Sequence, residues 1–221
     1  TGNLTADVTY TLVSVAYANT PTCSQNLTGS ASVAVRPGPS VSISGNTEVC
    51  QTNNATRAVT FTNNSNLAVI VNYSLNNVAQ TALNIAANGT QTINQSIATS
   101  GNFVYTITGV AYQSVPECSS DGSQSVTIKV NSQPSFTVCI VQPTLCPGEN
   151  SGGSVTFNAS GGSSFQYSIK ANPGVNDYQT QNVFSNLGAG SVTGFTVRND
   201  AGCVATATCN TVSPCVSAAQ T

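Results

Sequence analysis

The sequence contains no histidine, no tryptophan and no methionine, and only 5% of its 221 residues are charged. Without histidine the chain lacks the side chain that most often acts as a general base or a metal ligand. The seven acidic residues are scattered along the sequence, and this favours solvated turns over a pair of catalytic carboxylates. We therefore expect a protein that is not an enzyme, with no metal site and no cofactor.

Two further absences concern partners. The formal net charge is −2, so there is no basic surface of the kind that binds nucleic acid. No apolar run approaches the roughly 18 residues that suggest a membrane-spanning helix, so we expect no membrane span. The chain starts with Thr, and we read it as a processed or partial form of a longer product.

The eight cysteines point to disulfide bonds. They lack histidine neighbours and form no CxxC pair, so zinc binding is disfavoured. Disulfides persist in oxidising compartments, and we expect an extracellular or cell-surface location. The candidates for disulfide formation are Cys23, Cys50, Cys118, Cys139, Cys146, Cys203, Cys209 and Cys215.

Glycans are possible partners of the chain, covalently or by binding. N-x-S/T sites are present in about the number that this composition produces by chance, so each is a weak glycosylation candidate. The only loosely placed aromatic residue for sugar binding is Tyr178, and we favour packing for it. The glycosylation candidates are Asn3, Asn26, Asn54, Asn63, Asn72, Asn88, Asn94 and Asn158.

An internal repeat dominates the sequence. Residues 8–35 align without a gap to residues 103–130, at an offset of 95, and ten of the 28 positions are identical. A second alignment, at an offset of 96, pairs TEVCQ at 47–51 with PTLCP at 143–147. Repeats of this period indicate an array of small domains. We expect domains at 37–131 and 132–221, preceded by a partial domain at 1–36.

The pattern within each repeat is that of half-buried strands. Alternation places Leu67, Val69, Val71, Tyr73 and Leu75 on one face, and Phe103, Tyr105, Ile107 and Ala111 on another. Val126, Ile128 and Val130 alternate in the same way. About seven such strands in roughly 90 residues predict an all-β chain of tandem immunoglobulin-like two-sheet sandwiches.

The segments VSISGNTEVCQ, YTITGVAY and FTVRNDAGCVATA carry a resemblance to known proteins. They resemble the tandem immunoglobulin-like or PKD-like repeats of large bacterial cell-surface adhesins and extracellular fibres, especially adhesins of gliding bacteria. The resemblance covers nearly the whole chain. It implies a role in a surface structure or a fibre, and it transfers no catalytic residues.

The partial first domain suggests how such a chain would assemble. A lone hairpin is marginally stable in water, so residues 1–36 need a covering sheet. That sheet comes either from preceding residues of the same polypeptide or from another subunit, as in strand complementation. Our leading hypothesis is a structural subunit of an extracellular filament, with copies of itself joined head to tail. The alternative is an adhesin or carbohydrate-binding module, or a non-catalytic region of a larger secreted protein.

Sandwich geometry restricts the disulfide pairs. Cys50 and Cys118 belong to opposite ends of one sandwich, too far apart for the ~5.5 Å between Cα atoms that a bridge requires. Where two sandwiches meet end to end, Cys50 could reach Cys203 or Cys139. By the same argument Cys23 and Cys118 would pair with preceding domains. We expect at least one bridge across a domain or subunit boundary.

Overall fold

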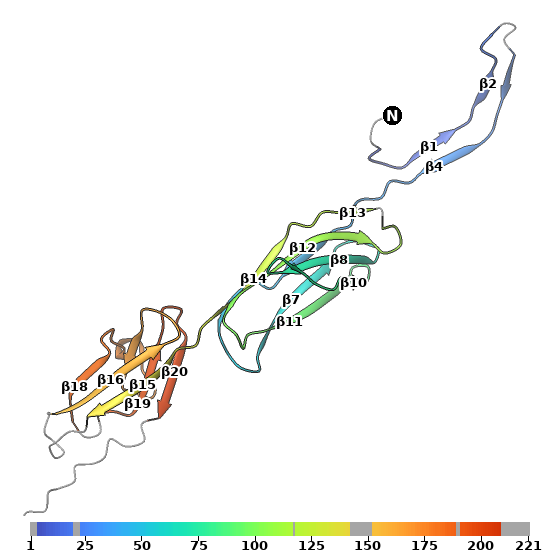
Figure 1. Cartoon of the computed structure of the whole chain (residues 1–221). Helices are drawn as coiled ribbons and strands as arrows, with labels where there is room; N and C mark the ends of the chain where they lie inside the picture. The colour runs from blue at the N-terminus through green and yellow to red at the C-terminus, as the bar shows by residue number, and fades with distance from the viewer. Residues whose placement is uncertain (1–3, 20–22, 117, 142–151, 189–190, 209–221) are drawn as a thin grey trace, which may run out of the picture.

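The computed structural model describes residues 4–19, 23–116, 118–141, 152–188 and 191–208. Within these ranges the chain is all-β apart from a 3₁₀ turn. Figure 1 shows a long N-terminal ribbon followed by two sandwiches in a row. Among the described residues, no helix has the length and hydropathy needed to cross a membrane. The chain therefore has the fold class that the alternating pattern predicts.

The N-terminal ribbon is one long hairpin made of two short ladders. β1 pairs antiparallel with β4, and β2 pairs antiparallel with β3 nearer the tip. Tyr10 lies opposite Ala31, and Val15 lies opposite Gln25. The strands are β1 (Val8–Thr11), β2 (Ser14–Ala16), β3 (Ser24–Asn26) and β4 (Ser30–Val33).

The middle sandwich is immunoglobulin-like by its strand topology. One sheet has the order β11-β7-β5 and the other β10-β8-β12-β14-β6, with β9 beside β8 and β13 beside β12. The last strand of the sandwich, β14, pairs antiparallel with β12 and parallel with β6. A three-stranded sheet that faces a larger sheet with this order and pairing of strands is the immunoglobulin arrangement. The strands are β5 (Val41–Ser44), β6 (Thr47–Cys50), β7 (Thr56–Asn63), β8 (Val69–Leu75), β9 (Val78–Ala79), β10 (Leu83–Ile85), β11 (Thr90–Ser96), β12 (Gly101–Tyr112), β13 (Ser119–Ser120) and β14 (Ser125–Asn131).

The core of the middle sandwich forms where the alternating positions of the two sheets meet. Val69, Val71 and Tyr73 are buried on β8, as their spacing predicts, and Phe61 of the opposite sheet packs against Tyr73 with ring centroids 5.2 Å apart. The buried residues of β14 are likewise those with alternating spacing: Val126, Ile128 and Val130. Burial of these apolar side chains between the sheets is the main stabilising contribution to the sandwich.

One predicted core position in β12 is wrong. Alternation from Tyr105 and Ile107 predicts that Ala111 faces the core, but Val110 and Tyr112 are the buried residues there. The register between β12 and β8 shifts between Ile107 and Gly109. An irregularity of this kind inserts an extra residue and moves the following side chains to the other face. The period of two therefore changes phase within this strand.

The last sandwich repeats the arrangement with fewer strands. One sheet has the order β15-β16-β18 and the other β17-β19-β20, and both are antiparallel. Phe157 is fully buried at its centre, and the offset of 96 aligns it with Phe61, which is fully buried too. The elements are β15 (Ser135–Val141), β16 (Gly153–Ser160), β17 (Gln166–Ser168), the 3₁₀ turn η1 (Val175–Asp177), β18 (Val183–Leu187), β19 (Gly194–Arg198) and β20 (Val204–Thr208).

The aromatic cluster around Phe157 should carry much of the stability of the last sandwich. Four rings surround it, with centroids 5.2 to 5.8 Å away. We expect Phe157→Ala to lower the free energy of unfolding of this sandwich by about 3–5 kcal/mol, because a large buried side chain is lost and a cavity remains. Urea unfolding followed by fluorescence or NMR measures this. Val175→Ala, at a residue that is 79% exposed, is the control, and an equal loss in both variants would contradict the assignment.

Candidate functional site

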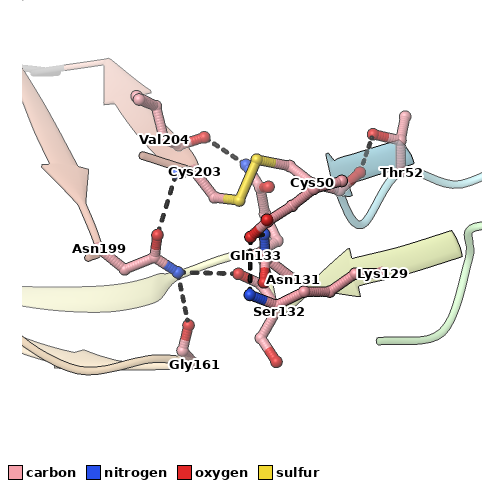
Figure 2. The surroundings of a disulfide bond; sticks show 11 residues. Cys50, Thr52, Lys129, Asn131, Ser132, Gln133, Gly161, Asn199, Cys203 and Val204 are labelled. Carbon is pink, nitrogen blue, oxygen red and sulfur yellow. Dashed lines mark hydrogen bonds and ion pairs between the residues drawn. A yellow bond between two sulfur atoms is a disulfide. The ribbon is translucent and has the colours of Figure 1, made fainter. Parts of the chain in front are cut away.

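The junction between the two sandwiches is joined covalently. Cys50 forms a disulfide with Cys203, across 153 residues of sequence, with Cα atoms 5.5 Å apart. Cys50 is the last residue of β6 and lies opposite Asn131 at the end of β14, while Cys203 is buried in the turn between β19 and β20. The sequence left Cys139 and Cys203 as possible partners of Cys50, and the structure joins Cys50 to Cys203. Figure 2 shows the bond above the segment that links the sandwiches.

A single buried amide organises this junction from the side of the last sandwich. The Asn199 Nδ2 group donates hydrogen bonds to the carbonyl oxygens of Ser132 at 2.9 Å and Gly161 at 3.2 Å. Its Oδ1 accepts the backbone N–H of Cys203 at 3.0 Å. The same side chain therefore holds the linker and positions the turn that carries the disulfide, as the dashed lines in Figure 2 show.

The linker itself lies against a turn that requires glycine. Gly161 has a φ of +84°, and a Cβ atom at this position would collide with the carbonyl oxygen of Gln133. Glycine has neither the steric penalty at positive φ nor the side chain that would push the linker away. The Gln133 side chain in turn donates from Nε2 to the carbonyl oxygen of Val204. The linker is thus fixed by hydrogen bonds and close packing.

The linker before the middle sandwich is held in the same way. The Tyr112 hydroxyl donates to the carbonyl oxygen of Pro37 at 3.0 Å, and the Ser120 hydroxyl donates to that of Pro39 at 2.6 Å. Pro37 precedes Ser132 by 95 residues, the offset of the internal repeat. Each linker therefore docks on the end of the sandwich that follows it.

The remaining cysteines differ in their surroundings. Cys23 is an exposed free thiol near the tip of the ribbon, and Cys118 is a partly buried free thiol in the turn between β12 and β13. Cys139 lies on β15 opposite Thr156. Cys146, Cys209 and Cys215 lie outside the described residues.

The candidate glycosylation sites divide by exposure. Asn63 is 1% exposed, and its Nδ2 group donates to the carbonyl oxygens of Leu67 and Ala86, both at 2.8 Å. A glycan on this nitrogen would replace one of the two donated hydrogens, and the buried side chain leaves no room for a sugar, so Asn63 does not suit the role of acceptor in the folded chain. Asn3 lies outside the described residues. The remaining candidates have exposed side chains, and they are Asn26, Asn54, Asn72, Asn88, Asn94 and Asn158.

A polar groove beside the disulfide contains two acidic residues whose carboxylates already have partners. It is lined by Glu48, Lys129 and Asp200 among others. The hydrogen bond from Lys129, 2.8 Å away, lowers the pKa of Glu48, and the hydroxyl of Ser163 lowers the pKa of Asp200. The contribution of these bonds to stability is therefore present at neutral pH and is lost as the pH falls through the lowered pKa values. Among the described residues, no group of three or more His, Cys, Asp and Glu side chains gathers to hold a metal ion.

Tyr178 is packed on one face. The guanidinium carbon of Arg198 lies 4.0 Å from the centre of its ring, a distance typical of a cation–π contact. Its ring is only partly exposed, which agrees with the preference for packing.

The ribbon is the surface that most resembles an interface. Tyr10, Leu12, Val15 and Tyr17 are each more than half exposed, and they follow one another along the first arm of the ribbon, in and beside β1 and β2. The corresponding residues of the middle sandwich, Tyr105, Ile107, Val110 and Tyr112, are each less than 5% exposed because a second sheet covers them. An exposed apolar face of this kind marks an interaction surface. Simple alternation in the sequence places Tyr10 and Leu12 on one face but Val15 and Tyr17 on the other, and the equivalence of Val15 and Tyr17 to buried residues emerges only from the structure of the middle sandwich.

Comparisons with known proteins yield similarities of fold only. No family model matches the chain, and no curated protein matches it. The C-terminal 282-residue fragment of intimin, solved with the intimin-binding domain of the translocated intimin receptor, is 18% identical with a TM-score of 0.43, covering 78% of this chain and 63% of that fragment. Invasin, a bacterial integrin-binding protein, is 15% identical with a TM-score of 0.28, covering 77% of this chain and 38% of invasin.

The chain thus spans less than two thirds of the length of either protein. The immunoglobulin-like assignment rests on the strand order and pairing of this chain itself.

Asn199 should stabilise both the linker and the last sandwich. We expect Asn199→Ala to cost about 1–3 kcal/mol, because the Cys203 N–H and the Ser132 carbonyl lose their partner in a buried place. Chemical denaturation measures the loss, and hydrogen exchange of the Cys203 amide locates it. Asn172→Ala is the control, since this exposed asparagine makes no side-chain hydrogen bond within the described chain. Equal effects would contradict the role of Asn199.

The disulfide should limit the relative motion of the two sandwiches. We expect Cys50→Ser to leave the secondary structure of each sandwich unchanged and to broaden the distribution of distances in small-angle X-ray scattering. The distribution broadens because loss of the disulfide leaves hydrogen bonds to the short linker as the main restraint between the sandwiches. Cys23→Ser, at an exposed free thiol, is the control. Identical scattering from both variants would show that the linker alone sets the geometry.

Proposed function

We propose that this chain is a structural segment of an extracellular filament or adhesin stalk, in which immunoglobulin-like sandwiches follow one another head to tail. In this proposal the N-terminal ribbon is completed by strands of an immunoglobulin-like unit in a neighbouring subunit. The observation that carries the proposal is the register of the ribbon, taken together with its uncovered apolar face.

The ribbon has the same register as the last hairpin of the middle sandwich. Val8 pairs with Val33, and 95 residues later Phe103 pairs with Ile128. Near the tip, Val15 pairs with Gln25, and Val110 pairs with Ser120. Each hairpin also has an equivalent hydrogen bond between its two ladders. In the ribbon the Leu12 N–H donates to the carbonyl oxygen of Gly29, and in the middle sandwich the Ile107 N–H donates to that of Gln124. Because the two hairpins have the same register and equivalent apolar residues, the same kind of strands would cover both.

The middle sandwich defines what that covering would be. There, β8 pairs with one edge of the hairpin, β6 runs parallel to the other edge, and β11, β7 and β5 form the opposite sheet. The occupant that we assign to the ribbon is therefore a set of immunoglobulin-like strands with these five roles. A single added strand would cover one edge and leave the apolar face in water.

Covering the ribbon would stabilise the contact by burying apolar surface. The five side chains of Tyr10, Leu12, Val15, Tyr17 and Val33 are roughly half to three-quarters exposed, so their burial would contribute on the order of 5 kcal/mol at about 1 kcal/mol each. Association and ordering offset part of this gain, and the added strand pairing contributes further hydrogen bonds. The resulting contact is heterologous, and its repetition generates a filament when successive rotations do not close into a ring.

The remaining features support a mechanical role. A disulfide and buried hydrogen bonds restrain the junction between sandwiches, and such restraint suits an element that transmits tension. Disulfides form in oxidising compartments, which favours the outside of the cell. The proposal is therefore structural rather than catalytic.

The ribbon should be required for assembly. We expect negative-stain images of native material to show filaments and Leu12→Asp to abolish them, because a carboxylate would be buried in the interface. Val13→Asp is the matched control: Val13 is 70% exposed, and its counterpart Thr108 faces solvent in the middle sandwich. Native material that contains no filaments, or filaments from Leu12→Asp, would overturn the proposal.

A further inference from the structure

A cysteine lies at one equivalent place in each of the three terminal hairpins. The carbonyl oxygen of Cys23 accepts the N–H of Tyr17 at 3.1 Å, and that of Cys118 accepts the N–H of Tyr112 at 3.2 Å. In the last sandwich the carbonyl oxygen of Cys203 accepts the N–H of Asn199 at 3.0 Å. The three turns therefore hold their cysteines by the same backbone bond, and only Cys203 is in a disulfide.

The occupied junction shows where the partner of such a cysteine lies. Cys50 ends the strand that runs parallel to β14, directly opposite Asn131, and the linker to the next sandwich starts one residue later at Ser132. The Asn199 side chain then holds the Ser132 carbonyl. A disulfide partner thus lies at the end of the parallel strand of the preceding sandwich, beside the start of the linker.

The first junction has the same parts except for this partner. Tyr112, the counterpart of Asn199, holds the carbonyl of Pro37, the counterpart of Ser132. Pro39 and Pro134, also 95 residues apart, are both buried against the sandwich that follows them. By the same offset, Arg36 is the counterpart of Asn131. A strand running parallel to β4 and ending beside Arg36 would bring its last residue to Cys118.

We infer that Cys118 is half of a second disulfide across a junction. Its partner is a cysteine at the end of the strand that runs parallel to β4 in the unit completing the ribbon. This inference rests on the proposed function, because it needs the ribbon to be completed. Two thiols each lose a proton, and a disulfide-donor oxidant takes up the two electrons and is reduced to two thiols. Cys118 is free and only partly buried, and both properties suit such a thiol.

The same logic assigns a third site to Cys23. Tyr17, which precedes the turn that holds Cys23, is 76% exposed, and the offset of 95 makes it the counterpart of Tyr112, whose hydroxyl binds the linker carbonyl. Cys23 and Tyr17 would therefore receive the linker and the parallel strand of whatever sandwich precedes the completed one.

The test supplies the ribbon with its missing strands from within the chain. A second copy of residues 37–100 is fused to the N-terminal side of Ala6, so that the added copy ends where β12 begins in the middle sandwich. Asn53→Gln in the added copy, at an exposed position, distinguishes its peptides by mass. The protein is oxidised with glutathione disulfide, alkylated without reduction, digested and mapped by mass spectrometry.

We expect the added copy of Cys50 to be linked to Cys118 in most molecules, and the native Cys50 to remain linked to Cys203. Cys118→Ser should abolish the new link, and Cys23→Ser should leave it intact. Hydrogen exchange at Tyr10 and Leu12 reports separately whether the ribbon is covered.

Two results would overturn the inference, and they are distinguishable. If the ribbon amides become protected while Cys118 is still alkylated, the ribbon is completed but the disulfide is not formed, so only this inference fails. If the ribbon amides exchange as fast as in the unaltered chain, strands of this type do not complete it, and the proposed function fails with the inference.

Discussion

The last hairpin of each unit must have its apolar face covered, and the rest of the structure follows from this constraint. In the middle sandwich the face of β12 and β14 lies against β5, β7 and β11, and its residues are almost fully buried. The ribbon has the same pairing without the opposite sheet. Since most of the stability of such a sandwich comes from apolar burial between sheets, a hairpin in this register is half of a core.

The same hairpin also makes the junctions. Its two strands contribute to the core, while the turn between them holds the preceding linker through Tyr112 in one sandwich and Asn199 in the next. One element thus ties the interior of a sandwich to its neighbour along the chain. Because only 5% of residues are charged, these junctions depend on hydrogen bonds to carbonyl oxygens and on a disulfide more than on ion pairs.

Several features of this architecture could be predicted from the sequence. The offset of 95 aligned the ribbon with β12 and β14, and alternation identified the cores of β8 and β14. The same alternation was wrong at Ala111, since a shift of register between Ile107 and Gly109 changes the phase of β12. The sequence motif at Asn63 gave no sign that its side chain is buried. The motif describes three neighbouring residues, whereas one of the carbonyl groups that hold the side chain lies 23 residues away.

By itself the sequence determined what depends on neighbouring residues: the strands, the all-β class, the repeat and the equivalence of its cysteines. Only the tertiary structure decided that Cys50 meets Cys203 rather than Cys139, and that Asn199 holds the linker between them. The physical reason is distance along the chain. Local patterns fix which face of a strand is apolar, whereas a bond between residues 153 positions apart depends on how two folded sandwiches stack end to end.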